Sequence, residues 1–166
     1  IIRTFNIDPY SYVAEKITQD DKTYHDKKRF VVAANGAVFK NQEGILPKII
    51  EEVWKQRDIA KKNKDAQTTY ATKIIMNSFY GVLSNPSCRF FNLEMSNAIT
   101  YTGEMIAKLT AKKIEELGYN VIYQDTDSAF IVSNTNNVED AVKTGKKIEK
   151  YINDFYKKYK IGRAHV

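Results

Sequence analysis

Two short apolar runs separated by only three residues place the strongest constraint on how this chain can fold. The runs cover residues 119–124 and 128–133, and Asp125, Thr126 and Asp127 lie between them. A link this short can join only antiparallel strands, because parallel strands need a crossover of about a dozen residues or more. The sequence therefore predicts a tight hairpin over residues 119–133, with two carboxylates at its tip.

A second hairpin is predicted over residues 29–40. Asn35 and Gly36 can adopt the two positive φ angles that a type I′ turn needs. Residues 15–29, which precede it, are polar and show no clear period. We expect them to form a loop.

Helical patterns occupy most of the remaining chain. Pro47 is tolerated in a first helical turn, Asp65 is a candidate N-cap, and Gly118 is a candidate C-terminal stop. The helices are expected over residues 44–62, 65–80, 94–117 and 138–159, and the last is basic and amphipathic. The first two are separated by a short turn and should be antiparallel neighbours. Helices interleaved with hairpins favour an α+β fold over a doubly wound parallel sheet.

Composition narrows the classes of site that the chain can carry. Lys and Arg outnumber Asp and Glu by 26 to 20, a formal net charge of +6. This balance favours a polyanionic partner, although basic side chains on solvated faces are common. One cysteine and two histidines exclude disulfide frameworks and zinc sites built from these residues. No run approaches ~18 apolar residues, so we expect no membrane span. We separately expect a cytoplasmic location.

Asp125 and Asp127 are the sharpest chemical feature. Carboxylates at i and i+2 on a strand end point to the same side, where they repel unless a cation lies between them. Mg²⁺ prefers such oxygen ligands, usually one or two carboxylates together with substrate phosphates. The alternative is ordinary turn chemistry, in which Asp and Thr are common.

Two groups of side chains on the first two helices suit an anionic, aromatic ligand such as a nucleotide. Lys73, Asn77 and Tyr80 share one helix face at i, i+4 and i+7. The opposite stretch, residues 74–76, is expected to pack. Arg57 and Lys61, at i and i+4, repel each other by a few tenths of a kcal/mol, which a phosphate would relieve. A solvated face of an amphipathic helix is the alternative for both groups.

Two motifs in this chain resemble those of family B DNA polymerases. Residues 73–81 match the family's K-x-x-x-N-S-x-Y-G motif B, and residues 123–128 match its Y-x-D-T-D-S motif C. The amino-acid sequences of three segments are similar to those of the DNA polymerase II-like subgroup. These segments are residues 73–83, 88–91 and 118–128. Residues 1–9 resemble the stretch that follows motif A, so the resemblance covers residues 1–160.

The resemblance implies a DNA-directed DNA polymerase and a role for each matching residue. Asp127 would be the main metal ligand of motif C, and Asp125 would support the metal site and the primer end. The nucleotide-binding residues would be Arg57, Lys61, Lys73, Asn77 and Tyr80. The residues near the primer or the nascent base pair would be Gly81, Tyr123, Thr126 and Ser128. Two Mg²⁺ ions are implied, with one shared ligand from motif A, which this sequence lacks.

The resemblance also implies a division of the chain. Residues 1–47 and 83–160 would belong to a palm, and residues 48–82 would form a two-helix fingers subdomain. The partners would be primer-template DNA, a dNTP and the rest of a polymerase chain, namely motif A, the thumb and an exonuclease domain. We expect this segment alone to be inactive. Residues 161–166 can be encoded by DNA that resembles a sequencing-library adapter, and we expect them to be an artefact.

Other interpretations stay open at this point. One is a non-catalytic nucleic-acid-binding module, which gives Asp125 and Asp127 no special role. Another is a split-polymerase subunit. A third is a different carboxylate-metal enzyme, which needs further acids nearby; Glu94 and Glu104 are better explained as helix residues.

Overall fold

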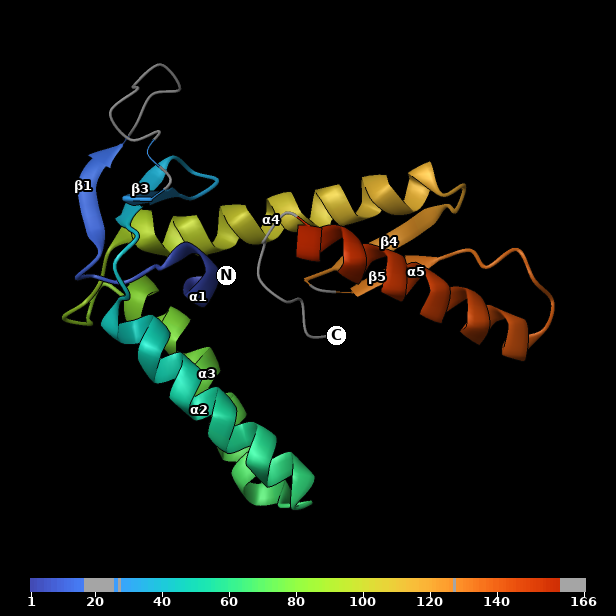
Figure 1. Cartoon of the computed structure of the whole chain (residues 1–166), viewed down its shortest axis with the longest axis horizontal. Coiled ribbons are helices and arrows are strands. Elements are labelled where there is room, and N and C mark those ends of the chain that lie inside the picture. The colour runs from blue at the N-terminus through green and yellow to red at the C-terminus, as the bar shows by residue number, and fades with distance from the viewer. Residues whose placement is uncertain (17–25, 27, 127, 159–166) are drawn as a thin grey trace. The chain divides into compact units, whose positions relative to one another are not determined.

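The computed structural model describes residues 1–16, 26, 28–126 and 128–158 (Figure 1). It contains two compact units, residues 1–102 and 103–166. The expected artefact at 161–166 lies outside the described residues. Each unit combines helices with an antiparallel sheet, which confirms the mixed α and β class predicted from the sequence.

The first unit contains a three-stranded sheet and a pair of long helices. Its elements are α1 (Ile2–Phe5), β1 (Tyr12–Lys16), β2 (Phe30–Val32), β3 (Ala37–Lys40), α2 (Ile45–Lys62), α3 (Ala66–Ser84) and the start of α4 (Leu93–Glu116). The strand order is β1-β3-β2, with Phe39 of β3 opposite both Tyr12 and Val31. Phe39 is fully buried and belongs to the core of this unit, together with Ile7, Leu83 and Met95.

Two elements of this unit were not predicted. The helix α1 is a single turn, which Asn6 ends with a left-handed φ of 51°. The strand β1 includes Glu15 and Lys16, so the expected loop over 15–29 is wrong at its start. A strand this polar forms because β3 offers it backbone partners, which local sequence does not reveal.

The hairpin over residues 29–40 forms, but its turn is not type I′. Only Gly36 of the predicted pair has a positive φ, at 83°. The Gly36 N–H donates to Ala33 O (3.0 Å) and the Ala33 N–H donates to Ala37 O (2.9 Å), a three-residue loop closed by a left-handed glycine. Asn35 instead uses its side chain, which accepts from the Ala37 N–H and donates to the Glu94 carbonyl.

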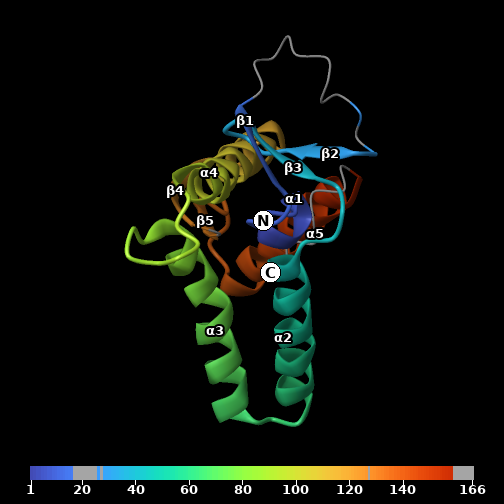
Figure 2. The same cartoon turned by 90° about the vertical axis from the view of Figure 1, so that its left-hand side faces the viewer.

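The helices α2 and α3 are antiparallel neighbours, as predicted (Figure 2). Asp65 caps α3 because its carboxylate accepts from the hydroxyl (2.7 Å) and the N–H (3.0 Å) of Thr68. These two hydrogen bonds lower the pKa of Asp65, since they favour the charged form. The helix continues to Ser84, four residues past the predicted end, and stops before Pro86, which disfavours helix at the preceding residue.

The start of α2 is tied to the chain near the N-terminus by buried polar side chains. The Asn6 amide donates to the carbonyls of Lys40 and Gln42 (both 2.6 Å), and its oxygen accepts from the Gly44 N–H (2.9 Å). The Asp8 carboxylate, 2% exposed, accepts from the Leu46 N–H in the first turn of α2 (2.6 Å). A carboxylate at this end also complements the helix dipole.

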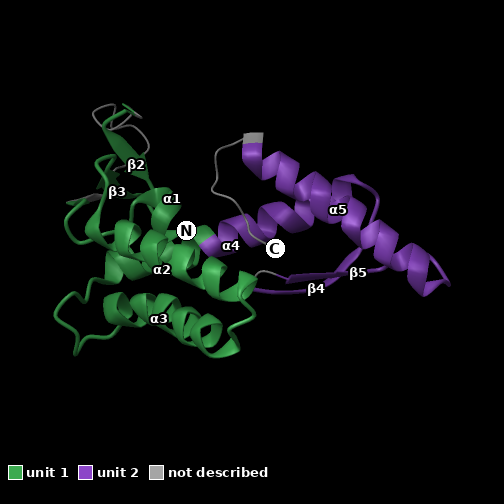
Figure 3. Ribbon diagram, turned by 60° about the horizontal axis from the view of Figure 1, so that its bottom comes forward, with its two compact units in different colours: residues 1–102 green, residues 103–166 purple. Residues whose placement is uncertain are grey.

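The second unit consists of a hairpin and two helical segments (Figure 3). Its elements are the rest of α4, the strands β4 (Val121–Asp125) and β5 (Ser128–Ile131), and α5 (Val138–Lys158). Gly118 follows α4 with φ 85°, as expected of a helix-stopping glycine. Tyr156 of α5 is buried and donates to Ile106 O of α4 (2.9 Å), and burial raises the pKa of its phenol.

Replacing Gly44 by Ala should destabilise the first unit. A Cβ at this position would lie 2.7 Å from Asp8 Cβ and 3.1 Å from Asn6 Oδ1, so both anchors would have to shift. We expect a loss of about 1–3 kcal/mol in the free energy of unfolding, measured by urea titration. The control is Gly145→Ala in α5, where an added Cβ meets nothing within 4 Å. Equal stability of the two variants would contradict this account.

Candidate functional site

The β4–β5 turn carries the acidic motif. Asp125 is the last residue of β4 and lies opposite Ser128, so the loop itself contains two residues. The Asp125 carboxylate is exposed and accepts from the Thr126 hydroxyl (3.0 Å). Thr126 has a φ of 50°, so the backbone leaves the extended conformation directly after Asp125. The predicted same-side arrangement of the two carboxylates stays a prediction. Asp127 lies outside the described residues.

The strand β4, which ends at Asp125, is hydrogen-bonded to α4. The Gln124 amide donates to the Ala107 carbonyl (2.7 Å) across 17 positions of sequence. The neighbouring residue, Tyr123, is 59% exposed and its ring contacts Phe130 of β5 (5.6 Å between ring centroids). One side of the hairpin thus anchors it to a helix, and the other presents aromatic side chains to solvent.

The predicted nucleotide face of α3 is exposed along its length. Lys73, Asn77 and Tyr80 are all exposed, and within the described part of the chain Lys73 forms no ion pair. The expectation that residues 74–76 pack is wrong for Ile74 and Ile75, which are 49% and 47% exposed. The packed side of α3 is built from Thr72 and Leu83 instead.

Gly81 continues this exposed face and has no structural reason to be glycine. It is helical, and apart from nearby helix backbone an added Cβ would meet no described atom within 4 Å. Glycine inside a helix costs roughly 0.5–1 kcal/mol relative to alanine. A residue that is unfavourable in a helix therefore occupies a position where the described chain leaves room for a side chain.

Arg57 and Lys61 lie one turn apart on α2. Lys61 is exposed, whereas Arg57 is half-buried. The Arg57 Nε is shielded from solvent and has no hydrogen-bond partner among the described residues. An unpaired buried donor is costly, so an anion that accepts from this guanidinium would stabilise the site.

The acids elsewhere in the described chain do not form a metal cluster. No group of three or more His, Cys, Asp or Glu side chains among the described residues could hold a metal ion. Glu104 pairs with Lys108 (2.6 Å), one helical turn away. Glu94 accepts from Asn35. Both carboxylates therefore already have partners within the first half of α4 or beside it, and their assignment as helix residues stays a prediction.

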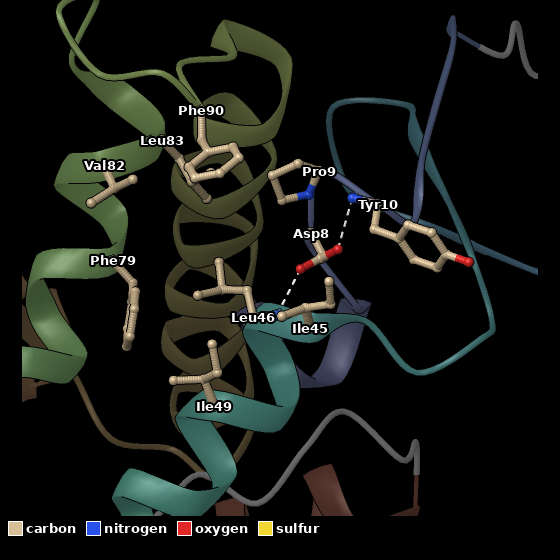
Figure 4. A pocket seen from close by; sticks show the side chains of 10 residues that line it. All are labelled: Asp8, Pro9, Tyr10, Ile45, Leu46, Ile49, Phe79, Val82, Leu83 and Phe90. Carbon is tan, nitrogen blue, oxygen red and sulfur yellow. Dashed lines mark hydrogen bonds between the residues drawn. The ribbon is translucent and has the colours of Figure 1, made fainter.

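Sequence reasoning missed the residues that position α2. Asn6, Asp8 and Gly44 hold the start of this helix, yet they are separated by up to 38 residues. The Asp8-Pro9 pair indicates only a local turn, which does form, because the Tyr10 N–H donates to Asp8 Oδ1 (2.8 Å). No local feature of the sequence indicates that the other oxygen of Asp8 accepts from the Leu46 N–H, 38 residues away (Figure 4).

Comparison with known proteins identifies the family. A family model described as DNA polymerase family B matches residues 1–163. The chain belongs to DNA polymerase family B. DNA polymerase II of Escherichia coli K12 is 39% identical over 157 residues, which cover 94% of this chain and 19% of that protein. The DNA polymerase alpha catalytic subunit of Dictyostelium discoideum is 36% identical over 127 residues, covering 70% of this chain and 8% of that protein.

A solved family B DNA polymerase has a similar fold. The enzyme from the archaeon Pyrobaculum calidifontis matches 90% of this chain and 20% of its own, with a TM-score of 0.64 and 22% identity. This family B chain thus spans about a fifth of the length of the bacterial and archaeal relatives it matches. Over the residues that the structure describes, no helix is both long and apolar enough to cross a membrane.

Gln124→Ala should loosen the hairpin. Loss of its hydrogen bond to Ala107 should lower the free energy of unfolding by about 0.5–1.5 kcal/mol, measured by urea titration. Gln56→Ala is the matched control, because Gln56 is an exposed residue of α2. The rate of backbone amide hydrogen exchange at Asp125 should rise in Gln124→Ala but not in Gln56→Ala. An unchanged rate in Gln124→Ala would show that Gln124 does not anchor the strand β4.

Proposed function

We propose that this chain is part of a DNA-directed DNA polymerase that extends a primer on a template. In this proposal α2 and α3 form the fingers, and residues 1–47 and 83–160 belong to the palm. Primer-template DNA, a dNTP and the rest of a polymerase chain are its partners. Membership of family B supports the activity, and the exposed face of α3 supports the nucleotide site.

The observation that carries this proposal is the glycine on the nucleotide face. Gly81 adjoins Lys73, Asn77 and Tyr80 in the same helix, and no described contact requires it. A base pair stacked against this surface would exclude a Cβ, and this would explain why a residue unfavourable in helices is kept there. An amphipathic helix with a merely solvated face offers no such reason.

The residues act in two groups. Arg57, Lys61 and Lys73 bind the triphosphate and offset its charge, and the unpartnered Arg57 Nε is suited to a phosphate oxygen. Asp125 and Asp127 offer carboxylate oxygens, the ligand type that Mg²⁺ prefers, with Asp127 as the main ligand. When bound, two Mg²⁺ ions supply stabilisation of the attacking and leaving oxygens.

The reaction transfers a nucleotidyl group. The primer 3′-hydroxyl oxygen forms a bond to the α-phosphorus and loses its proton, while the bond from that phosphorus to pyrophosphate breaks. Tyr80 and Gly81 pack beside the new base pair, and Tyr123, Thr126 and Ser128 lie near the primer end. Base pairing with the template selects the nucleotide, so protein contacts to DNA are mainly to phosphate and sugar.

Gly81→Ala separates stability from function. In the complete polymerase, the variant should gain roughly 0.5–1 kcal/mol of helix stability yet lose at least about tenfold in kcat/KM for dNTP incorporation. Gly145→Ala, also in a helix with open space around it, should gain similar stability with unchanged activity. Primer extension and thermal unfolding measure the two effects, and full activity in Gly81→Ala would refute the proposed face.

Asp127→Asn tests the metal-dependent chemistry. Loss of one carboxylate charge should abolish primer extension while primer-template binding persists, because Asp127 acts on the reacting phosphate rather than on DNA affinity. Asp140→Asn is the control, since Asp140 is an exposed residue of α5 paired with Lys143. If Asp127→Asn keeps full extension activity, the chain is better explained as a nucleic-acid-binding module.

A further inference from the structure

One face of α5, in the second unit, carries a stripe of lysine side chains. The stripe consists of Lys143, Lys146, Lys147 and Lys150, all of which are exposed. At 100° per residue, the four side chains fall within an arc of about 100° around the helix axis. They span about 10 Å along that axis, since each helical residue adds about 1.5 Å. The lysine stripe is therefore a narrow and continuous basic surface.

The packing of α5 on α4 determines that the lysine stripe faces solvent. The two helices lie side by side within the second unit (Figure 3), and the Tyr156 hydroxyl donates to the Ile106 carbonyl of α4 (2.9 Å). Ile148 and Tyr156 lie on the side of α5 opposite the stripe and are 6% and 3% exposed. This contact uses the apolar side of α5 within the fold, and it leaves the lysine side available to a partner.

Most of the positive charge in the stripe has no counter-charge nearby. Asp140 pairs only with Lys143, at one end of the stripe (3.2 Å). Among the residues that the structure describes, Lys146, Lys147 and Lys150 form no ion pair. Lys150 is four residues from Lys146 and three from Lys147, and like charges at these spacings repel and destabilise a helix. A polyanion that lies along the stripe would remove this cost.

We propose that the lysine stripe is a contact surface for the phosphate backbone of duplex DNA, in addition to the proposed primer and nucleotide residues, none of which lies on α5. The inference rests on the proposed function only in taking DNA as the polyanion that this chain meets. A length of about 10 Å matches about three phosphates of one strand, which recur every ~3.4 Å along the duplex axis. Lysine binds phosphate as a point charge, so the contact is independent of base sequence.

Two other anionic partners fit α5 less well. An amphipathic helix binds an anionic membrane by burying its apolar face, whereas Ile148 and Tyr156 on that face are already buried in the fold. The core of a protein–protein interface is enriched in arginine and depleted in lysine, whereas α5 contains no arginine and its stripe is entirely lysine. Duplex DNA requires neither an apolar face nor arginine, because its phosphates need only positive charge.

The test measures how salt weakens the binding of the complete polymerase to a covalently closed circular duplex, which offers no primer end. The test variant replaces the three unpaired lysines by glutamine, a similarly good helix former: Lys146→Gln, Lys147→Gln and Lys150→Gln. The control variant makes the same change at three exposed lysines elsewhere in the chain, namely Lys48, Lys64 and Lys112. The slope of log K against log salt should fall in magnitude by about 2–3 in the test variant and by less than about 1 in the control, since each lost phosphate contact removes ~0.9. Arginine at the same three stripe positions should restore the slope.

Three binding results would overturn the proposal: no binding of the closed duplex, an unchanged slope in the test variant, or an equal reduction in both variants. A lower melting temperature in the test variant alone would also overturn it. Loss of mutual repulsion should leave that temperature equal or higher, whereas loss of contacts to an acidic segment of the polymerase would lower it. Primer extension at saturating primer-template should be unchanged in both variants. The closed duplex supports no extension, so failure of this test leaves the proposed polymerase function intact.

Discussion

The anchoring of α2 by Asn6 and Asp8 is the constraint on which the first unit depends. These two buried side chains bind the backbone of residues 40–46 and thereby connect the chain after α1 to the entrance of a long helix. Gly44 is required because any Cβ there would collide with the Asp8 side chain. A long helix such as α2 needs a well-anchored start, and buried hydrogen bonds to charged or amide groups provide one.

The helix α3 meets two demands on opposite sides. Leu83 packs into the core of the first unit, while Lys73, Asn77 and Gly81 face solvent. The helix is costly in isolation, since it includes a glycine on this exposed side and two exposed isoleucines elsewhere on its surface. Costs of this kind are expected where a surface serves a ligand rather than the fold, and they are consistent with the stability–function conflict common at functional sites.

Much of the fold was predictable because its signals are local. The cap at Asp65, the stop at Gly118 and the two hairpins follow from residue types that satisfy or terminate nearby backbone. The errors arose where distant groups compete. Asn35 did not adopt a positive φ because its side chain binds the Ala37 N–H and the start of α4. The strand β1 forms because β3 offers it a partner, not because its own residues alternate.

The sequence by itself determined the family, the antiparallel class and the motif residues, because these rest on residue identity, spacing and short connections. The tertiary structure decided which of those side chains are exposed and which carboxylate is buried. Burial and long-range hydrogen bonds depend on segments that meet only after folding, as Asp8 and Leu46 do across 38 positions. Local pattern cannot encode such a meeting, since either residue alone is compatible with many neighbours.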